Sequence, residues 1–241
     1  MDKKLIVVGH RGAKALYPEN TMLSFEKAIE LGVDGIETDI RMSKDGVLML
    51  MHDATLARTT NTEVGGIENY TYAQLKKMDA GCKFSPEFSG CQIPTLQELL
   101  ELCQGKNLFL NLEIKEFRKE VVDATLKLMQ QMNMGDDFVI ASFSPMITTY
   151  AQKTCGVKTQ GFPRRHYENF TEDIYDGMYA VGISMKDLTR ELVEEYRQMN
   201  IQPWCWCPDT PEAIEKAVAA TSPLATVNNP YPALAYNKQF A

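Results

Sequence analysis

The sequence has little of what nucleic-acid and membrane proteins use. Its 241 residues include 25 Lys or Arg against 32 Asp or Glu, which gives a formal net charge of −7. This balance argues against nucleic acid or an anionic membrane surface as a partner. No apolar run approaches the roughly 20 residues of a membrane-spanning helix, so we expect no stable membrane anchoring. An anionic substrate would therefore need local cations or a bound metal.

Closely spaced cysteine pairs are also missing. The six cysteines form no C-x-x-C pair, and Cys205 and Cys207 would face opposite ways in a strand. We expect reduced, mostly buried thiols of a cytoplasmic protein, although the even count leaves a disulfide open. A strand predicted at residues 5–8 leaves no room for a signal peptide, which favours the same location.

What the chain does contain is an alternation of strand and helix patterns. The length of 241 residues is close to the usual size of a (β/α)8 barrel. Main-sheet strands are predicted at residues 5–8, 35–40, 107–115, 138–143, 157–162, 180–185, 202–207 and 225–228. Intervening helices imply parallel strands. Eight such strands predict an α/β fold, a (β/α)8 TIM barrel, with a doubly wound open sheet as the alternative.

One segment interrupts this rhythm. Asp45-Gly46 is a turn signal, so residues 47–51 are predicted to fold back on the second strand as a hairpin. Residues 54–93 then hold scattered glycines and only a short helical piece. We expect a small inserted subdomain there, within a single domain of residues 1–241. Asn20 and Thr95 are the predicted N-caps of the flanking helices.

The second strand carries two carboxylates on one face. Glu37 and Asp39 alternate with apolar Ile36 and Ile40, because successive strand side chains point to opposite faces. On an exposed sheet this would be an ordinary half-buried strand. Inside a barrel, two neighbouring anions are costly unless a cation or hydrogen-bond donors compensate them.

Charged or titratable groups end the first strands of the predicted barrel. They are His10 and Arg11, Glu37 and Asp39, His52 and Asp53, and Glu113 and Lys115. Barrel active sites form at the carboxyl ends of the strands, so these groups should converge. Three carboxylates suit a hard divalent cation, Arg and Lys suit phosphate oxygens, and two imidazoles can exchange protons. The mixture indicates phosphoryl transfer.

Each of these groups also has a purely structural interpretation. Glu113 and Lys115 can form a rim ion pair, and Asp53 and Asn20 can be turn or helix caps. Only three histidines occur, however, and two of them lie at this rim. The third, His166, is interpreted as a surface loop residue without a role.

The assembled motifs resemble the glycerophosphodiester phosphodiesterase family, within the phosphatidylinositol-phospholipase-C-like phosphodiesterases. The similarity covers about the first half of the chain. It lies in His10-Arg11-Gly12, Pro18-Glu19-Asn20-Thr21, Glu37-x-Asp39, Asp45-Gly46, His52-Asp53, Leu56-x-Arg58-Thr59-Thr60, Ile93-Pro94-Thr95-Leu96 and Glu113-Ile114-Lys115.

The resemblance implies a barrel with an inserted subdomain after the second strand. It also implies roles for seven residues. His10 and His52 would be the acid–base pair, Glu37, Asp39 and Glu113 would hold one divalent cation, Mg or Ca, and Arg11 and Lys115 would bind the phosphate. Asn20 and Asp53 would support these groups.

The second half fits the family less well. Trp206 is similar to the family's tryptophan on the seventh strand, but Cys207 follows it where threonine is frequent. Asn228 stands near the last strand where the family commonly has aspartate. We expect both departures to shape the leaving alcohol's pocket, which Phe143 is also expected to line.

The resemblance implies a metal-dependent hydrolase that cleaves a small-molecule glycerophosphodiester to glycerol 3-phosphate and an alcohol. Attack by water and attack by the glycerol 2-hydroxyl through a cyclic phosphate both remain open. Alternatives are a lysophospholipase D-type activity, another phosphodiesterase activity, or a non-catalytic barrel that binds phosphodiesters. The sequence leaves the alcohol and the oligomeric state undetermined.

Overall fold

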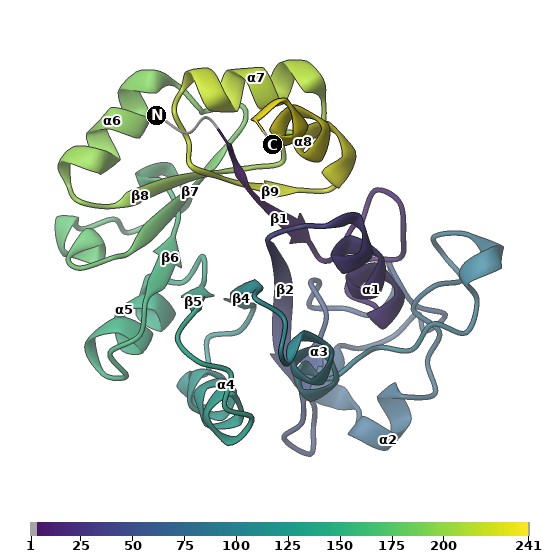
Figure 1. Ribbon diagram of the computed structural model, residues 1–241. Helices are drawn as coiled ribbons and strands as arrows, with labels where there is room; N and C mark the ends of the chain where they lie inside the picture. Colours follow the sequence, from purple (N-terminus) through teal and green to yellow (C-terminus); the bar gives the residue numbers. More distant parts are fainter. Residues whose placement is uncertain (1–3, 241) are drawn as a thin grey trace.

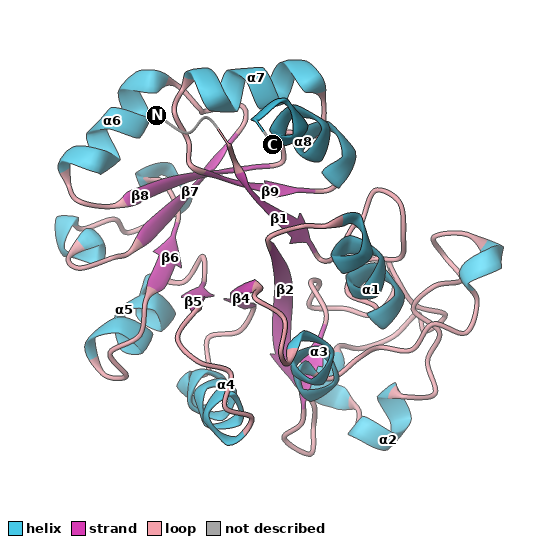
Figure 2. Ribbon diagram, in the orientation of Figure 1, coloured by secondary structure: helices cyan, strands magenta, loops and turns pink. Residues whose placement is uncertain are grey.

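A closed ring of parallel strands forms the centre of the protein (Figures 1 and 2). The computed structural model describes residues 4–240. The ring strands are β1 (Ile6–His10), β2 (Gly35–Met42), β4 (Phe109–Ile114), β5 (Phe138–Ala141), β6 (Thr159–Gly161), β7 (Ala180–Ser184), β8 (Gln202–Trp206) and β9 (Leu224–Val227). Because β1 pairs with both β9 and β2, the sheet has no open edge here. The predicted (β/α)8 barrel is confirmed, and the open sheet is excluded.

Strand register brings the acidic residues together. In the β1–β2 pair His10 lies opposite Glu37, and in the β2–β4 pair Asp39 lies opposite Glu113. Residues in register across neighbouring strands project to the same face. The barrel pairing alone therefore assembles three carboxylates and an imidazole from strands far apart in sequence.

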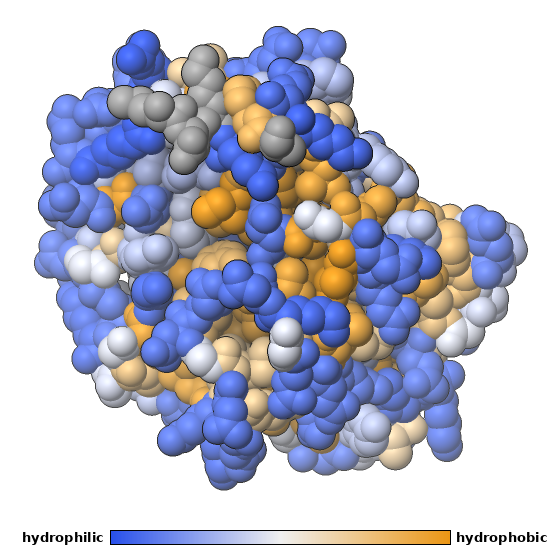
Figure 3. All heavy atoms as spheres, in the orientation of Figure 1, coloured by the Kyte–Doolittle hydropathy of each residue, from blue (hydrophilic) through white to orange (hydrophobic). Residues whose placement is uncertain are grey.

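Helices surround the ring (Figure 2) and alternate with its strands, except that only 3₁₀ turns join β6 to β7 and that α2 lies in the inserted segment. They are α1 (Met22–Leu31), α2 (Tyr72–Leu75), α3 (Leu96–Cys103), α4 (Lys119–Gln131), α5 (Pro145–Lys153), α6 (Arg190–Gln198), α7 (Pro211–Ala219) and α8 (Pro230–Asn237). The apolar faces of all of these except α2 pack on the outside of the barrel in one large core. In the space-filling view, hydrophilic side chains cover most of the periphery and hydrophobic ones show mainly toward the centre (Figure 3).

Helix capping differs from the prediction at one position. Thr21, not Asn20, caps α1, because the Thr21 hydroxyl accepts a hydrogen bond from the Ser24 amide at 3.2 Å. Asn20 has a positive φ of 52° and turns its side chain toward β2 instead. The predicted capping box of α3 is present, with Thr95 and Glu98 bonded reciprocally.

The segment after β2 leaves the barrel. The short strand β3 (Leu48–Leu50) returns antiparallel to β2, as the Asp45-Gly46 turn predicted. The following residues carry α2 and short 3₁₀ turns, and they lie outside the ring beside α1 and α3 (Figure 1). A small apolar cluster holds this region, composed of Met49, Met51, Leu56, Ile67, Leu75, Ala80 and Ile93.

The barrel interior is closed below the site. Val8, Val139, Ala180, Trp204 and Leu224 form a buried cluster contributed by five strands. The rings of Phe109 and Trp204 meet edge to face, with centroids 5.5 Å apart. This cluster fills the interior of the ring beneath the carboxyl-end mouth. No helix among residues 4–240 is long and apolar enough to cross a membrane.

Candidate active site

A pocket of about 160 Å³ occupies the mouth of the barrel. Its lining combines groups from nearly every strand: His10, Arg11, Glu37, His52, Asn111, Glu113, Lys115, Phe143, Gln160, Phe162, Gly182, Trp204, Cys205, Trp206 and Thr226. Eight of the eleven predicted site residues are ionisable, and eight of the eleven line this mouth. Asp39, Asn20 and Asp53 lie directly behind the lining rather than on it.

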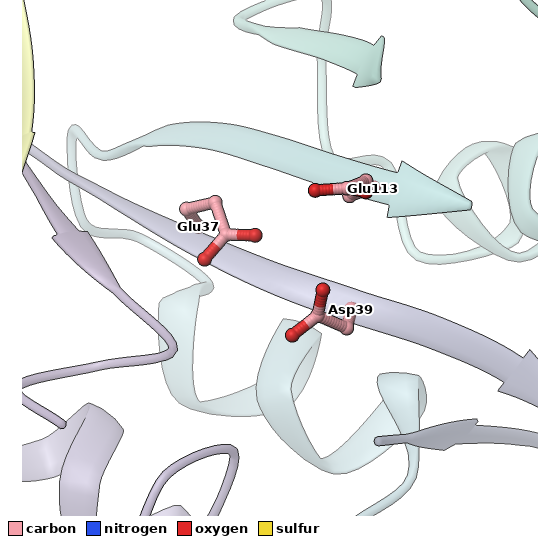
Figure 4. A group of neighbouring side chains, drawn as sticks. All are labelled: Glu37, Asp39 and Glu113. Carbon is pink, nitrogen blue, oxygen red and sulfur yellow. The ribbon is translucent and has the colours of Figure 1, made fainter. Parts of the chain in front are cut away.

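Three carboxylates converge at one side of the pocket. Figure 4 shows Glu37 and Asp39 on β2 and Glu113 on the neighbouring β4, with their carboxylates turned toward a common space. One oxygen from each lies within 4.8 Å of the others. Glu37 Oε1 and Asp39 Oδ1 are buried without a hydrogen-bond partner among the described residues. Uncompensated buried anionic oxygens are costly, so the donor set fits a divalent cation with oxygen ligands.

The pKa values of the three carboxylates are shifted by their burial and by the neighbouring charges. Burial, and next the Asp39 charge, raises the pKa of Glu37 well above its usual range. Burial also raises the pKa of Glu113, although Lys115 opposes the shift. Burial acts in the same direction on Asp39, but the charges of Arg11 and Lys115 outweigh it and lower the pKa of that carboxyl. Without a cation, Glu37 and Glu113 therefore favour the protonated form, as crowded buried carboxylates do, whereas Asp39 favours the ionised form.

Two cations stand beside the acidic cluster. Arg11 Nε lies 3.0 Å from Asp39 Oδ2, and Arg11 Nη1 donates to Glu19 Oε1 at 2.8 Å. Lys115 Nζ lies 2.7 Å from Glu113 Oε1 and 3.8 Å from Asp39 Oδ1. The rim ion pair between Glu113 and Lys115 thus exists, but it belongs to a wider network. Both cations line the pocket, where an anionic ligand would meet them.

A strained turn fixes Arg11. The backbone of Arg11 has a φ of 52°, and its amide donates to the Glu37 carboxylate at 2.9 Å. Gly12 follows with a φ of 87°, and a Cβ there would lie only 2.4 Å from Ser24 Oγ. Only glycine fits this turn. The turn holds the guanidinium of Arg11 against β2 and makes its position part of the barrel.

His10 is held by a neutral partner. Its Nδ1 lies 2.6 Å from Asn228 Oδ1, while Asn228 Nδ2 donates to Asp209 Oδ2. Because the amide nitrogen faces a carboxylate, Oδ1 must accept the proton of His10 Nδ1. The other nitrogen, Nε2, then presents a lone pair 3.7 Å from Glu37 Oε2. Burial, with the charges of Arg11 and Lys14, lowers the pKa of His10 to about 3.

His52 is held by a charged partner. Its Nδ1 lies 2.6 Å from Asp53 Oδ1, and Arg41 Nη2 donates to the His52 carbonyl at 2.9 Å. Burial lowers the pKa of His52, but Asp39 and Asp53 oppose this shift. The two histidines therefore line one pocket with different supports, a carboxamide behind His10 and a carboxylate behind His52.

Aromatic rings form the other side of the pocket. Phe143 stacks on Phe162 with the ring planes 9° apart, and Lys115 Nζ lies 5.4 Å from the Phe143 centroid. The edge of His166 packs against both phenyl rings, so its interpretation as a surface loop residue is incomplete. Trp206 also lines the pocket. Its Nε1–H is buried and lacks a hydrogen-bond partner within residues 4–240.

Two expectations about the second half of the chain need correction. Cys207 and Asn228 do not line the pocket; they lie behind the His10 ring, with Cys207 Sγ 3.4 Å from His10 Nδ1. The departures from the family pattern therefore adjoin a histidine instead of shaping an alcohol pocket. Asn228 follows β9, which pairs with β1, and Cys207 follows β8, the next strand along, so closure of the ring brings both to His10.

Sequence reasoning also missed several neutral and bridging residues. Asn111 donates to Gln160 at 2.7 Å, and both line the pocket. The position of Asn111 on the inward face of β4 was a usable signal for it. Glu19 and Arg58 occur in the family motifs, but nothing in their local sequence pattern indicates that they pair with each other at 2.7 Å.

The comparisons with known proteins agree with this geometry. A sequence profile of the Glycerophosphoryl diester phosphodiesterase family matches residues 10–222. A glycerophosphodiester phosphodiesterase of Caldanaerobacter subterraneus subsp. tengcongensis is 32% identical over 90% of this chain and 91% of its own. One of Bacillus altitudinis is 40% identical over 57% of each chain.

A solved structure gives the same fold. An Oleispira antarctica phosphodiesterase, in complex with the product sn-glycerol-3-phosphate, superposes with a TM-score of 0.86 at 23% identity, covering 98% of this chain and 96% of that one. The fold and the acidic pocket define a barrel phosphodiesterase. The chain belongs to the glycerophosphoryl diester phosphodiesterase family, which confirms the predicted resemblance and the predicted class of enzyme.

Proposed function

We propose that the protein hydrolyses glycerophosphodiesters to glycerol 3-phosphate and an alcohol in a metal-dependent reaction. One observation carries the proposal. Three carboxylates with oxygens within 4.8 Å of one another share a pocket with two histidines, an arginine and a lysine. Binding of glycerol 3-phosphate by the Oleispira antarctica protein supports the same product class.

Glu37, Asp39 and Glu113 are proposed as the ligands of one divalent cation, Mg²⁺ or Ca²⁺. The cation would supply Lewis-acid polarisation of a phosphate oxygen. Arg11 and Lys115 stand on either side of the cluster and would bind the remaining non-bridging oxygens. Asn20 Nδ2 donates to Asp39 Oδ2 at 2.8 Å, which orients that carboxylate toward the pocket.

His10 is proposed as the general base and His52 as the general acid. The Nε2 of His10 offers a lone pair, since its Nδ1 proton is given to Asn228, and the lowered pKa keeps the ring neutral. His52 has the Asp53 carboxylate behind it, which stabilises a protonated ring. His10 would then take the proton of the attacking hydroxyl, and His52 would protonate the leaving alcohol oxygen. Water and the glycerol 2-hydroxyl are both candidates for the nucleophile.

The uncharged side of the pocket is proposed to recognise the organic groups of the substrate. Trp206 Nε1–H and Asn111 Oδ1 are a buried donor and a buried acceptor without partners among the described residues. A hydroxyl group can satisfy both functions. The stacked Phe143 and Phe162 rings would contact the leaving alcohol. We further propose that residues 54–93 act as an inserted subdomain of one barrel domain, and that the protein is cytoplasmic.

The test is release of glycerol 3-phosphate from a panel of glycerophosphodiesters, with lysophospholipids in parallel. We expect turnover with glycerophosphodiesters, loss of activity in EDTA, and recovery on adding back Mg²⁺ or Ca²⁺ separately, which identifies the metal. Turnover restricted to lysophospholipids would favour a lysophospholipase D-type enzyme. Binding of glycerophosphodiesters without any turnover would contradict the proposal and favour a non-catalytic barrel.

A further inference from the structure

Arg58 lies near the start of the inserted segment and bridges two carboxylates at the rim of the pocket. Its Nε and Nη2 donate to Asp53 at 2.5 and 3.0 Å. Its Nη1 and Nη2 donate to Glu19 at 2.8 and 2.7 Å. Both contacts are bidentate, a geometry that only the planar guanidinium fork provides. The side chain thus ties the β1–α1 loop to the chain that leaves β3.

Each of the two carboxylates has a second partner in the active site. Asp53 contacts His52 Nδ1 at 2.6 Å, and Glu19 accepts from Arg11 Nη1 at 2.8 Å. Arg58 itself is not among the pocket-lining residues. It therefore reaches the proposed reaction only through the groups it holds.

The position of Arg58 is set independently of these contacts. Leu56 is fully buried in the apolar cluster of the inserted segment, and its carbonyl accepts from the Thr60 amide at 3.0 Å. These anchors hold the backbone on either side of Arg58. The Arg58 side chain is 48% exposed, so solvent partly screens its ion pairs and limits what they contribute to stability. The two bidentate contacts also fix the direction of both carboxylates.

We propose that Arg58 is a positioning residue, which fixes the Asp53 carboxylate and through it the orientation of the His52 imidazole. Glu19 anchors Arg58 to the β1–α1 loop. The inference rests on the proposed function, since it assigns Arg58 to the same acid–base step. Hydrogen bonds from Arg58 also lower the pKa of Asp53, so the carboxylate behind His52 stays ionised. The inserted segment thereby completes the His52 side of the active site.

The matched test compares Arg58→Ala with Arg118→Ala. Arg118 is equally exposed, at 47%, and pairs with Glu116 on the same rim but contacts neither histidine. We expect Arg58→Ala to lower kcat about 10–100-fold on a glycerophosphodiester, as loss of a supporting group does, with little change in KM. Arg118→Ala should keep the wild-type kcat. Arg58→Lys should not restore the rate, because an ammonium cannot make the two forked contacts, whereas added guanidinium ion should restore part of it in Arg58→Ala.

A double-mutant cycle separates positioning from general loosening. In the His52→Ala background, Arg58→Ala should cost little further kcat, while in the His10→Ala background it should keep most of its effect. Equal losses in both backgrounds, or a kcat for Arg58→Ala equal to that of Arg118→Ala, would overturn the inference. An inactive wild-type protein would instead refute the proposed function, because the wild type is measured in the same assay.

Discussion

The two sides of the pocket differ in chemistry although one barrel builds both. The first side, here the charged wall, comprises His10, Arg11, Glu37, His52, Glu113 and Lys115, from β1, β2, the end of β3 and β4. The second side, the aromatic wall, comprises Phe143, Phe162, Trp204 and Trp206, from β5, β6 and β8 and their loops. Ionisable groups dominate one wall, and uncharged rings dominate the other.

The difference between the two walls suggests that one serves catalysis and the other serves substrate selectivity. Each group of the charged wall is held by at least one ion pair or hydrogen bond that fixes its direction. Chemistry on a phosphate requires such fixed charges, because preorganised electrostatics supplies most of the rate. The aromatic wall offers contact area, which we propose determines which alcohol is bound. On this account, substitutions in the charged wall lower kcat, and substitutions in the aromatic wall change selectivity.

The largest effect is expected for the histidines. His10→Ala and His52→Ala should each lower kcat about 10²–10⁴-fold, the usual contribution of a general acid or base. His52→Ala should recover much of its rate on a p-nitrophenyl phosphodiester, whose leaving group needs no proton, and His10→Ala should not. Steady-state kinetics on both esters measures this. If both variants retain the wild-type kcat on a glycerophosphodiester, the catalytic assignment is wrong.

The second-largest effect is expected on metal binding. Glu37→Gln removes a proposed ligand while preserving shape, and we expect more than about a 100-fold loss of divalent-cation affinity, beyond that of a supporting residue. Isothermal titration with Mg²⁺ and with Ca²⁺ measures it, with exposed Glu101→Gln on α3 as the control. Unchanged affinity in Glu37→Gln and in Asp39→Asn would remove the metal site from the charged wall.

A smaller effect is expected in the aromatic wall. Phe162→Leu removes the ring stacked on Phe143. The ratio of kcat/KM for two glycerophosphodiesters with different leaving alcohols should therefore change by about 10-fold, the usual size of such a pocket contact. Phe117→Leu is the control, because Phe117 is 76% exposed and outside the pocket. A large fall in kcat with an unchanged ratio would place Phe162 with the catalytic groups instead.

The smallest effect concerns stability in acid. Burial raises the pKa of Glu19, but Arg58 and Arg11 outweigh it and lower that pKa to about 2. A depressed pKa stabilises the fold above the ordinary value near 4.5 and loses that contribution as pH falls toward 2. Wild type should lose up to about 1.4 kcal/mol per pH unit from this group, and Glu19→Gln should lack that loss. Urea midpoints between pH 4.5 and 2 measure it; parallel curves would refute the pairing.

The sequence predicted the charged wall better than its supports. Alternation along β2 and β4 predicted that Glu37, Asp39 and Glu113 lie on the inward face. The register of the β2–β4 pair then places Asp39 opposite Glu113. The partners behind them were not predictable in this way. Asn228 meets His10 across 218 positions, and Arg58 meets Glu19 across 39, through loops that have no periodicity. Such contacts depend on how the ring closes and how the inserted segment folds back.

Helix boundaries show the same limit on a smaller scale. Asn is a favoured N-cap residue, but Asn20 has a φ of 52° and its side chain donates to Asp39, so the cap is Thr21. Local propensity favours Asn over Thr as an N-cap. Tertiary contacts with β2 decided between them, since Thr38 also donates to Asn20 Oδ1 at 2.9 Å.

The division of work between the two walls has one direct test. The kcat/KM ratio for glycerophosphocholine over glycerophosphoethanolamine is measured for wild type, His10→Ala and Phe162→Leu under one set of conditions. The account predicts a wild-type ratio in His10→Ala despite its collapsed rate, and a changed ratio in Phe162→Leu with kcat largely retained. A changed ratio in His10→Ala together with a wild-type ratio in Phe162→Leu would contradict the account.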